Sequence, residues 1–349
     1  PPGAVFIGAV AARKATESVD IFLQQLINGL TLGSVYAIVA LGYTMVYGII
    51  QLINFAHGEV VMVGAMVALT VIGALAKAVP GMPPFLIMGI AVACAVPVCM
   101  AVGYGMERIA YRPLRRAPRL APLITAIGIS IILQHLALLI FSRNPLSFPQ
   151  ILGNRMFEVA GAHISAVQIA IILGSVALMT GLTLLVYKTR LGIAMRATSE
   201  NVQVAGLMGV NINRVISATF VIGAALGAIA GVMVGTYYGI AHYTMGAMLG
   251  LKAFSAAVLG GIGNLAGAML GGILLGIVEA LGAGYIGEFT DLCQVSWLAA
   301  GPLAERCADG GNFVLFGSNY QDVFAFFVLI IVLIFRPSGL LGERVSDRA

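Results

Sequence analysis

The sequence predicts an all-α, polytopic membrane protein: a helical bundle of 8–9 transmembrane helices with short broken or re-entrant segments. Of its 349 residues, 60% are hydrophobic and only 9% are charged, and the mean hydropathy is +1.01. A typical soluble domain is about 25% charged. The apolar runs, such as 215–238, are continuous and lack the alternation of outer-membrane strands. Because a spanning helix needs about 20 apolar residues, the chain is long enough for such a bundle.

The chain divides into three parts. Residues 1–20 are expected to form a flexible lead-in, because the apolar stretch 4–12 is shorter than a secretory signal and its cleavage site require. Residues 21–345 are predicted as a single transmembrane domain, and 346–349 as a C-terminal tail.

Basic residues define the predicted topology. They gather in the loops 107–119 and 188–214 and in the C-terminal segment that contains Arg336, Arg344 and Arg348. The positive-inside rule assigns all three segments to the cytoplasm. Two apolar runs, 123–141 and 165–187, separate the first loop from the second, so the connection 142–164 is expected to be external.

Four further apolar runs separate the second basic loop from the C-terminal segment: 215–238, 246–260, 265–285 and 322–335. Four crossings keep both ends in the cytoplasm and make the loop 286–320 external. That loop carries four carboxylates against a single arginine, Arg306, which suits an external position.

Three apolar runs, 24–48, 58–78 and 84–106, precede the first basic loop and favour nine crossings with an external N-terminus. Arg13 and Lys14 argue against that orientation. The alternative has one run folded back as a re-entrant element, which gives eight crossings and a cytoplasmic N-terminus.

The four cysteines fall into two pairs. Cys94 and Cys99 lie inside an apolar run and are expected to be packing residues. Cys293 and Cys307 flank Trp297 in the predicted external loop, where an oxidising compartment permits a disulfide. Closing such a loop would contribute on the order of 3 kcal/mol. The cysteine and histidine spacing predicts no metal site.

The sequence lacks the motifs that several classes of function require. The sequence contains no G-x-x-x-x-G-K-[ST] phosphate loop, so we do not expect the chain to hydrolyse ATP. Hydrolase motifs are absent as well, and we predict that the protein is not an enzyme. The net charge of +5 comes from loops beside apolar runs, so no nucleic-acid partner is expected; the partner is the lipid bilayer. The remaining class of function is transport for which another chain supplies the energy.

The second basic loop is predicted to contain a cytoplasmic helix. Thr198 or Ser199 can cap it, Glu200 and Asn201 fall in its first turn, and Gly209 can end it. A cytoplasmic helix has no bilayer in which to bury its apolar residues, so we expect them to bind in a groove on a partner protein. These residues are Val202, Ala205, Leu207 and Met208. The alternative is a helix that rests on the lipid interface.

The segment from Asn54 to Glu59 interrupts two apolar runs with polar residues. One interpretation is that Asn54 caps a helix starting near Gly58, with His57 and Glu59 at the cytoplasmic surface. The other is that the three polar residues line a translocation path or its cytoplasmic gate, since polar groups at membrane depth are costly without such a role.

A second asparagine, Asn264, also interrupts two apolar runs, and we assign it to the same translocation path or gate. A parallel internal repeat could produce both breaks. Lys252 and Glu279 are ionisable residues in apolar surroundings; a functional role is one interpretation, and snorkelling or pairing near an interface is the other.

Three motifs carry a family resemblance. They begin at Leu26 (LINGLTLGSVYA, ending in the NFAHGE break), at Gly192 (GIAMRA, continuing to Arg214) and at Arg336 (RPSGLLG). In this order they resemble the branched-chain amino acid ABC transporter permeases of LivH type, over residues 21–345.

The resemblance implies an inner-membrane subunit of a bacterial importer for leucine, isoleucine and valine. Its expected partners are a second permease subunit (LivM type), two ATP-binding subunits and a periplasmic amino-acid-binding protein. ATP and Mg would be bound by the partner ATPase subunits, and this chain itself would bind no cofactor. Related permeases carry other amino acids, urea or amides, and a stand-alone secondary transporter is the alternative from another class.

The resemblance also assigns the second basic loop as the coupling segment that contacts the ATPase subunits. The residues concerned are Gly192, Arg196, Ala197, Glu200, Asn201, Ala205 and Gly209. The external stretch 288–317 is longer than in the family pattern, and we expect it to dock the binding protein or to stabilise the loop.

Overall fold

The computed structural model describes residues 2–291 except 116, 119, 152, 154 and 160, and then 293, 314, 315, 317 and 320–342; side chains are described from residue 19 on, apart from 159, 288 and 289. The described chain is almost entirely helical, and seven of its helices are long and apolar enough to cross a membrane. The predicted all-α class is confirmed.

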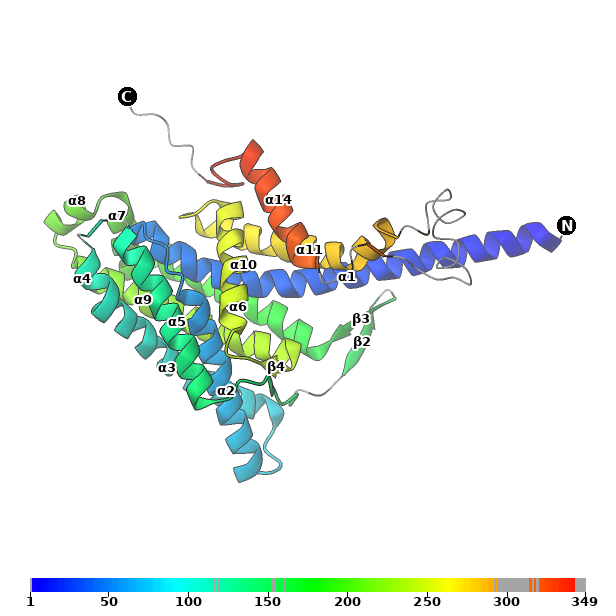
Figure 1. The fold of residues 1–349 in the computed structure, drawn as a ribbon, viewed down its shortest axis with the longest axis horizontal. Coiled ribbons are helices and arrows are strands. Elements are labelled where there is room, and N and C mark those ends of the chain that lie inside the picture. Colours follow the sequence, from blue (N-terminus) through cyan, green and yellow to red (C-terminus); the bar gives the residue numbers. More distant parts are fainter. Residues whose placement is uncertain are drawn as a thin grey trace.

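The helices and strands follow one another along the chain as shown in Figure 1. The elements are α1 (Pro2–Ile50), α2 (His57–Ala78), α3 (Pro84–Gly105), the π-helix η1 (Met106–Tyr111), α4 (Arg112–Leu114), α5 (Leu120–Ile140), β1 (Leu146–Ser147), β2 (Met156–Val159), β3 (Ala162–Ser165), α6 (Ala166–Lys188), α7 (Arg190–Glu200), α8 (Val202–Leu207), α9 (Ile212–Tyr238), β4 (Ile240–Ala241), α10 (Met245–Gly260), α11 (Leu265–Phe289) and α14 (Gln321–Phe335).

Each of the nine predicted apolar runs corresponds to a helix, but two of the helices are short. α10 has 16 residues and α14 has 15. At 1.5 Å per residue they measure about 24 and 22 Å, less than the roughly 30 Å hydrocarbon core of a bilayer. Full crossings were predicted at these two runs, and the structure shows apolar helices there that are shorter than a full crossing requires.

The N-terminal residues, which were expected to form a flexible lead-in, are helical from Pro2 on. α1 begins at Pro2 and continues without interruption to Ile50. The stretch before the first span is rich in alanine, which is the best helix former, so the helix extends beyond the apolar run.

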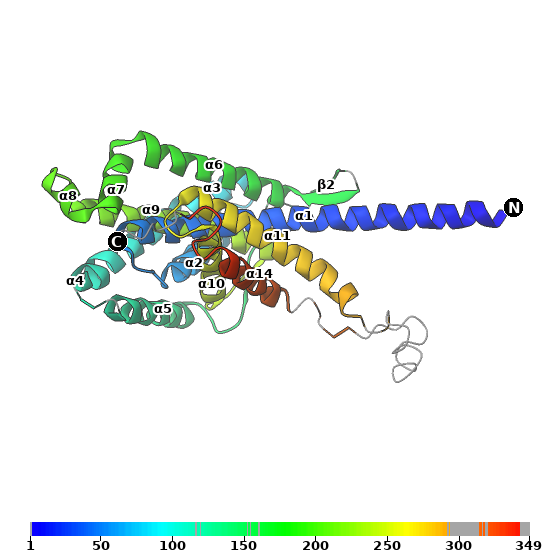
Figure 2. The same ribbon diagram turned by 90° about the horizontal axis from the view of Figure 1, so that it is seen from above.

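The centre of the bundle is the antiparallel pair α1 and α11, which lie side by side in Figures 1 and 2. Glycines make this approach possible. A Cβ atom at Gly29 would lie 2.7 Å from the Cα of Ile277, and one at Gly33 would lie 2.7 Å from the Cα of Ile273. Small residues at membrane helix contacts let the backbones pack directly, which explains the high glycine content of this chain.

A second layer is formed by α2, α3 and α9. Gly64 on α2 packs against Ala228 on α9, and Gly103 on α3 packs against Ala224 of the same helix. The buried apolar residues on these helices, among them Met62 and Met66, form a core continuous with α3. α9 therefore joins the α2–α3 layer to the central pair.

The two ends of the bundle carry different structures. β2 and β3 form a hairpin near one end, and α7 and α8 lie at the other (Figures 1 and 2). The hairpin leads directly into α6, whose start is fixed by a capping box between Ser165 and Gln168. The connection 142–164, predicted as a loop, thus contains the strand β1, which pairs with β4 after α9, and the β2–β3 hairpin, which ends at Ser165.

Candidate functional site: the coupling segment, the polar break and a cavity beside the coupling segment

The predicted coupling helix is in fact two helices. Asn201, and not Thr198 or Ser199, is the cap: its side-chain oxygen accepts hydrogen bonds from the backbone N–H groups of Gln203 and Val204, both at 3.0 Å. The hydroxyls of Thr198 and Ser199 instead donate to carbonyls within α7. The prediction of one helix was therefore wrong, because Asn201 adopts an extended conformation that ends α7 and starts α8.

The residues of this segment divide between packing and surface. Gly192 lies against the end of α6, where a side chain would collide with the carbonyls of Val186 and Leu185. Ala205 is buried, whereas Ala197, Glu200 and Asn201 are exposed. Packing at Gly192 and Ala205 thus holds α7 and α8 on the bundle and leaves Glu200 and Asn201 at the surface.

Two further residues fix the geometry of the segment. The guanidinium carbon of Arg196 lies 5.0 Å from the ring centre of Tyr187, a cation–π contact to α6. Gly209 has a φ of 87°, the left-handed conformation expected just after a helix ends.

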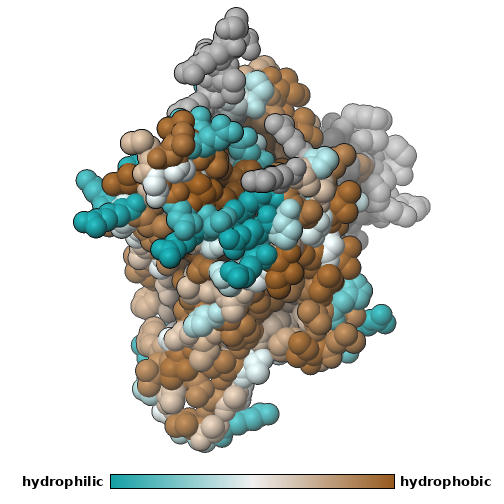
Figure 3. All heavy atoms as spheres, turned by 90° about the vertical axis from the view of Figure 1, so that its left-hand side faces the viewer, coloured by the Kyte–Doolittle hydropathy of each residue, from teal (hydrophilic) through white to brown (hydrophobic). Residues whose placement is uncertain are grey.

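Large apolar side chains project from α8 and the turn after it. Leu207 is 87% exposed and Met208 81% exposed, with Val202 and Val204 about half exposed beside them. Figure 3 faces this end of the molecule and shows a band of hydrophilic side chains with hydrophobic ones next to it. The apolar residues expected to need a partner are therefore uncovered within the described chain, apart from Ala205.

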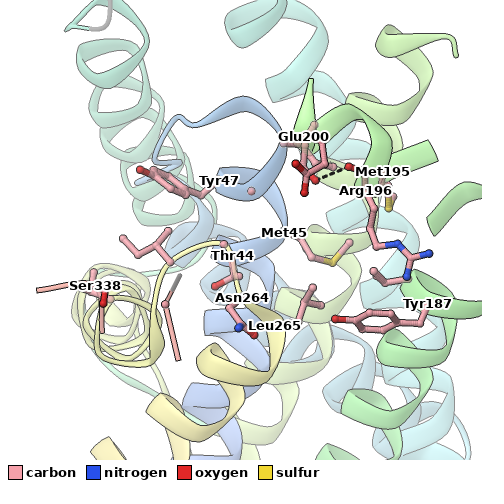
Figure 4. Close-up of a pocket in the computed structure, with 18 of the residues that line it drawn as sticks. Thr44, Met45, Tyr47, Tyr187, Met195, Arg196, Glu200, Asn264, Leu265 and Ser338 are labelled. Atoms are coloured by element: carbon pink, nitrogen blue, oxygen red, sulfur yellow. Dashed lines mark hydrogen bonds between the residues drawn. The ribbon is translucent and has the colours of Figure 1, made fainter. Parts of the chain in front are cut away.

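A cavity of about 550 Å³ lies between α7, the end of α1, the turn that joins α10 to α11, and the C-terminal segment. Figure 4 shows Arg196 and Glu200 on one wall, with Thr44, Asn264 and Ser338 among the residues around the rest. The cavity thus brings two of the predicted coupling residues together with Asn264.

Asn264 has a structural role that the sequence did not indicate. Its side-chain oxygen accepts a hydrogen bond from the N–H of Gly267 in the first turn of α11, and its amide donates to the carbonyl of Leu341 at 2.9 Å. Leu340 and Leu341 in turn donate their backbone N–H groups to the carbonyls of Leu259 and Gly260. The C-terminal RPSGLLG motif is therefore fastened to the α10–α11 turn.

The break between α1 and α2 is buried. Asn54 is 2%, His57 2% and Glu59 0% exposed. Asn54 does not cap α2, which starts at His57; its side chain accepts a hydrogen bond from the Tyr111 hydroxyl at 2.8 Å. The interpretation with His57 and Glu59 at the surface was wrong, because α2 starts within the bundle, between α1, α9 and α10.

His57 and Glu59 each have one side-chain atom without a partner. The His57 ring fills the space left by the missing side chain of Gly42 and packs edge-on against Tyr43, with ring centres 4.9 Å apart. Glu59 accepts hydrogen bonds from Ser130 at 3.1 Å and Gln134 at 2.7 Å, both on α5. Within the described residues, His57 Nε2 and Glu59 Oε2 have no hydrogen-bond partner. Asn264 makes none of these contacts, so the proposed gate residues do not form one cluster.

Lys252 and Glu279 are paired. Lys252 Nζ lies 2.7 Å from Glu279 Oε1 and 2.7 Å from Asp322 Oδ1, and the Tyr36 hydroxyl donates to Glu279 Oε2 at 3.0 Å. Four helices, α1, α10, α11 and α14, thus meet at one charged cluster. The sequence singled out the lysine and the glutamate, but not Tyr36 or Asp322, which lie far from them along the chain.

A second charged cluster joins the two basic loops. Glu107 on the π-helix is buried and pairs with Arg115, while Ser217 on α9 donates to it at 2.6 Å. Arg115 also donates to Asn213 at 2.7 Å. Burial lowers the pKa of the Arg115 guanidinium from its usual value, and the Glu107 carboxylate opposes that shift. This link between the loops was not predicted.

Cys94 and Cys99 are free, and Cys293 is disulfide-bonded. Cys307 and most of the external loop lie outside the described residues, so the Cys293–Cys307 pairing stays a prediction. Among the residues described, no group of three or more His, Cys, Asp or Glu is placed to hold a metal ion.

Comparisons with known proteins point to one family. A family model described as "Branched-chain amino acid transport system / permease component" matches residues 25–333. The chain is 46% identical over 331 residues to the high-affinity branched-chain amino acid transport system permease protein BraD of Pseudomonas aeruginosa, covering 94% of this chain and 98% of that protein.

More distant similarity extends to other organisms. The chain is 41% identical over 332 residues to the permease protein LivH of Escherichia coli K12, covering 94% and 97% of the two chains. It is 25% identical over 313 residues to a probable LivH of Methanocaldococcus jannaschii, covering 87% and 88%. No solved structure matches significantly.

Proposed function

Because this chain belongs to the branched-chain amino acid permease family, we propose that it is a membrane-spanning subunit of an ATP-driven importer that carries leucine, isoleucine and valine across the bacterial inner membrane. A second permease subunit completes the path, two ATP-binding subunits bind ATP and Mg and supply the energy, and a periplasmic binding protein delivers the amino acid.

The observation that carries the ATP-driven part of the proposal is the exposed apolar surface of α8. Leu207 and Met208 project from a segment at the end of the bundle, and both are more than four-fifths exposed. Burying two such side chains in a groove contributes about 1.5–3 kcal/mol each. A helix that inserts apolar side chains into a groove is a common way for proteins to dock.

The packing of α7 explains how movement would pass into the membrane. Gly192 places α7 directly on the end of α6, and Arg196 contacts Tyr187 on the same helix. A shift of α8 with its groove would therefore move α6 and the walls of the cavity. ATP drives such a change only if it stabilises one of the two arrangements more than the other.

The chain itself acts as a conduit. Its charged clusters join helices, and among the residues that the structure describes, the polar atoms of Lys252 and Glu279 are used in pairing. The sequence contains no phosphate-loop motif, so we assign ATP hydrolysis to the partner subunits.

Reconstitution tests the proposal. The chain is assembled in proteoliposomes with the second permease and the two ATP-binding subunits, and uptake of labelled leucine is measured with the binding protein outside and ATP inside. We expect uptake that requires ATP and the binding protein together. Uptake that is driven by an ion gradient without ATP would show a secondary transporter instead, and competition by urea or amides but not by isoleucine or valine would change the substrate.

A further inference from the structure

The cavity between α7 and the α10–α11 turn has the features of a ligand site. Its volume of about 550 Å³ lies within the usual range for small-molecule pockets, roughly 300–1,000 Å³. Four segments far apart in the sequence build it (Figure 4). A molecule bound there would touch the coupling segment and the central helix at the same time.

One residue that lines this cavity has a buried polar atom without a partner. Thr44 lines the cavity and is 1% exposed, and its hydroxyl has no hydrogen-bond partner within the described residues. Other helical threonines, including Thr31 and Thr219, donate to the carbonyl four residues earlier. A buried hydroxyl without a partner costs free energy, which a ligand acceptor or donor in the cavity would recover.

Two opposite charges line the same cavity without neutralising each other. Arg196 and Glu200 are one helical turn apart on α7, yet neither belongs to any ion pair of the described residues. The rest of the lining combines polar residues such as Tyr47 and Asn264 with apolar side chains, which are Met45, Ile49, Val186, Met195, Val258 and Leu265. A cation, an anion and an apolar wall in one cavity match a molecule that carries both charges and an aliphatic side chain.

We propose that this cavity binds one hydrophobic amino acid in its zwitterionic form. Its carboxylate pairs with Arg196, its ammonium group pairs with Glu200, the Thr44 hydroxyl forms a further hydrogen bond, and its side chain packs on the apolar wall. The inference rests on the proposed function for the class of ligand. It adds a binding site on this chain that needs neither ATP nor the binding protein.

Such a site would connect substrate to the coupling segment. The bound amino acid would join α7 to the end of α1 and so stabilise the arrangement seen in the structure relative to any arrangement in which the cavity opens. The amino acid could come from the periplasm, in transit, or from the cytosolic pool, as a product that slows further import.

Equilibrium binding of radiolabelled leucine to the full-length chain in lipid nanodiscs tests the site. Gly48 allows a cavity-filling variant, since it lines the cavity and its Cβ position has 3.8 Å to the nearest atom. Gly48→Leu is expected to abolish saturable binding. Gly181→Leu is the matched control, because Gly181 lies on α6 with open space around it; its binding should equal that of the unmodified protein.

The unpartnered hydroxyl of Thr44 allows a second, independent test of the site. Thr44→Val removes one hydrogen bond to the ligand and should weaken binding by about five-fold. Thr219→Val removes an equally buried hydroxyl that is satisfied within its own helix, and should leave leucine binding unchanged. Isocaproate, which lacks the ammonium group, and isoamylamine, which lacks the carboxylate, should compete more weakly than leucine.

Three results would overturn the inference. These are the absence of saturable leucine binding, binding that persists in Gly48→Leu, and competition by either single-charge analogue that is as strong as competition by unlabelled leucine. ATP-driven uptake that stays intact in the same preparation would show that the proposed function stands without the site. Uptake by proteoliposomes distinguishes a periplasmic from a cytosolic source of the amino acid. If the amino acid binds in transit, Gly48→Leu lowers the rate of uptake itself. If it binds as a product, Gly48→Leu instead relieves the inhibition of uptake by leucine added on the ATP side.

Discussion

The hydroxyl of Tyr111 donates a 2.8 Å hydrogen bond to the side-chain oxygen of Asn54, and both residues are buried. Tyr111 is the last residue of the π-helix, and Asn54 belongs to the break between α1 and α2. The bond therefore joins two irregular segments of backbone. π-Helical turns occur frequently at functional sites, and here the turn directs a tyrosine at the polar break.

Removing the hydroxyl leaves the Asn54 oxygen buried without its donor. Tyr111→Phe is expected to reduce stability by about 1–3 kcal/mol, measured by thermal unfolding of the purified protein in detergent. In a double-mutant cycle, Asn54→Leu should cost much less when it is combined with Tyr111→Phe than when it is made alone. Additive costs would mean that the two side chains do not depend on each other.

His57 and Glu59 test the gate interpretation. Both are buried at the start of α2, and each has one unpartnered polar atom among the residues described. We expect His57→Ala and Glu59→Ala to reduce leucine uptake several-fold while the protein still reaches the membrane. Uptake normalised to the amount of protein in the membrane is the measurement, and unchanged uptake in both variants would remove the gate interpretation.

The exposed residues of α8 test the docking surface. Leu207→Glu and Met208→Glu change side chains that are more than four-fifths exposed, so the fold should be unaffected. Co-purification of the ATP-binding subunits with the permease should fall at least ten-fold, since burying a carboxylate in an apolar groove is unfavourable. Met156→Glu on β2, also exposed, is the control. Equal loss of the subunits in the control would argue against a specific role of α8.

Lys252 neutralises two carboxylates that lie 2.7 Å away. Lys252→Met leaves Glu279 buried without its counter-charge and should destabilise the protein by about 3–5 kcal/mol. Adding Glu279→Gln should recover part of the loss, because the remaining charge on Asp322 is partly exposed. Thermal unfolding measures both variants, with Lys77→Met at the exposed end of α2 as the control.

The number of reactive thiols tests the cysteine pairing. Cys94 and Cys99 are free thiols. Under denaturing, non-reducing conditions we expect two of the four cysteines to react with a maleimide, and all four to react after reduction. Four reactive thiols before reduction would contradict a Cys293–Cys307 bridge.

The sequence predicted the helices well because each apolar run is continuous, and most runs are near the length that a bilayer requires. The contacts between helices were not predictable, since they join residues separated by many positions. Tyr36 and Glu279 are 243 positions apart, and Asn54 and Tyr111 are 57 apart. No local pattern relates such residues, and only the packing of glycines on α1 and α11 brings the first pair together.

The coupling segment shows where local reasoning succeeds and where it fails. The left-handed conformation of Gly209 and the exposed apolar residues follow from local chemistry and were predicted. The division at Asn201 was missed, because Thr198, Ser199 and Asn201 are all good caps and the choice depends on the packing of α7 against α6. The burial of His57 was missed for a related reason: its space exists only because Gly42 on α1 lacks a side chain.

The backbone pairing of Leu340 and Leu341 with Leu259 and Gly260 sets an order of events during synthesis. Leu340 and Leu341 follow Leu259 and Gly260 by 81 positions (340 − 259 and 341 − 260), so the α10–α11 turn is synthesised well before the residues that bind it. The carbonyls of Leu259 and Gly260 therefore lack these donors until α11 and α14 have been made. A polypeptide truncated just before Leu340 would contain all the long helices that the structure describes, but the α10–α11 turn would not be tied to the segment after α14.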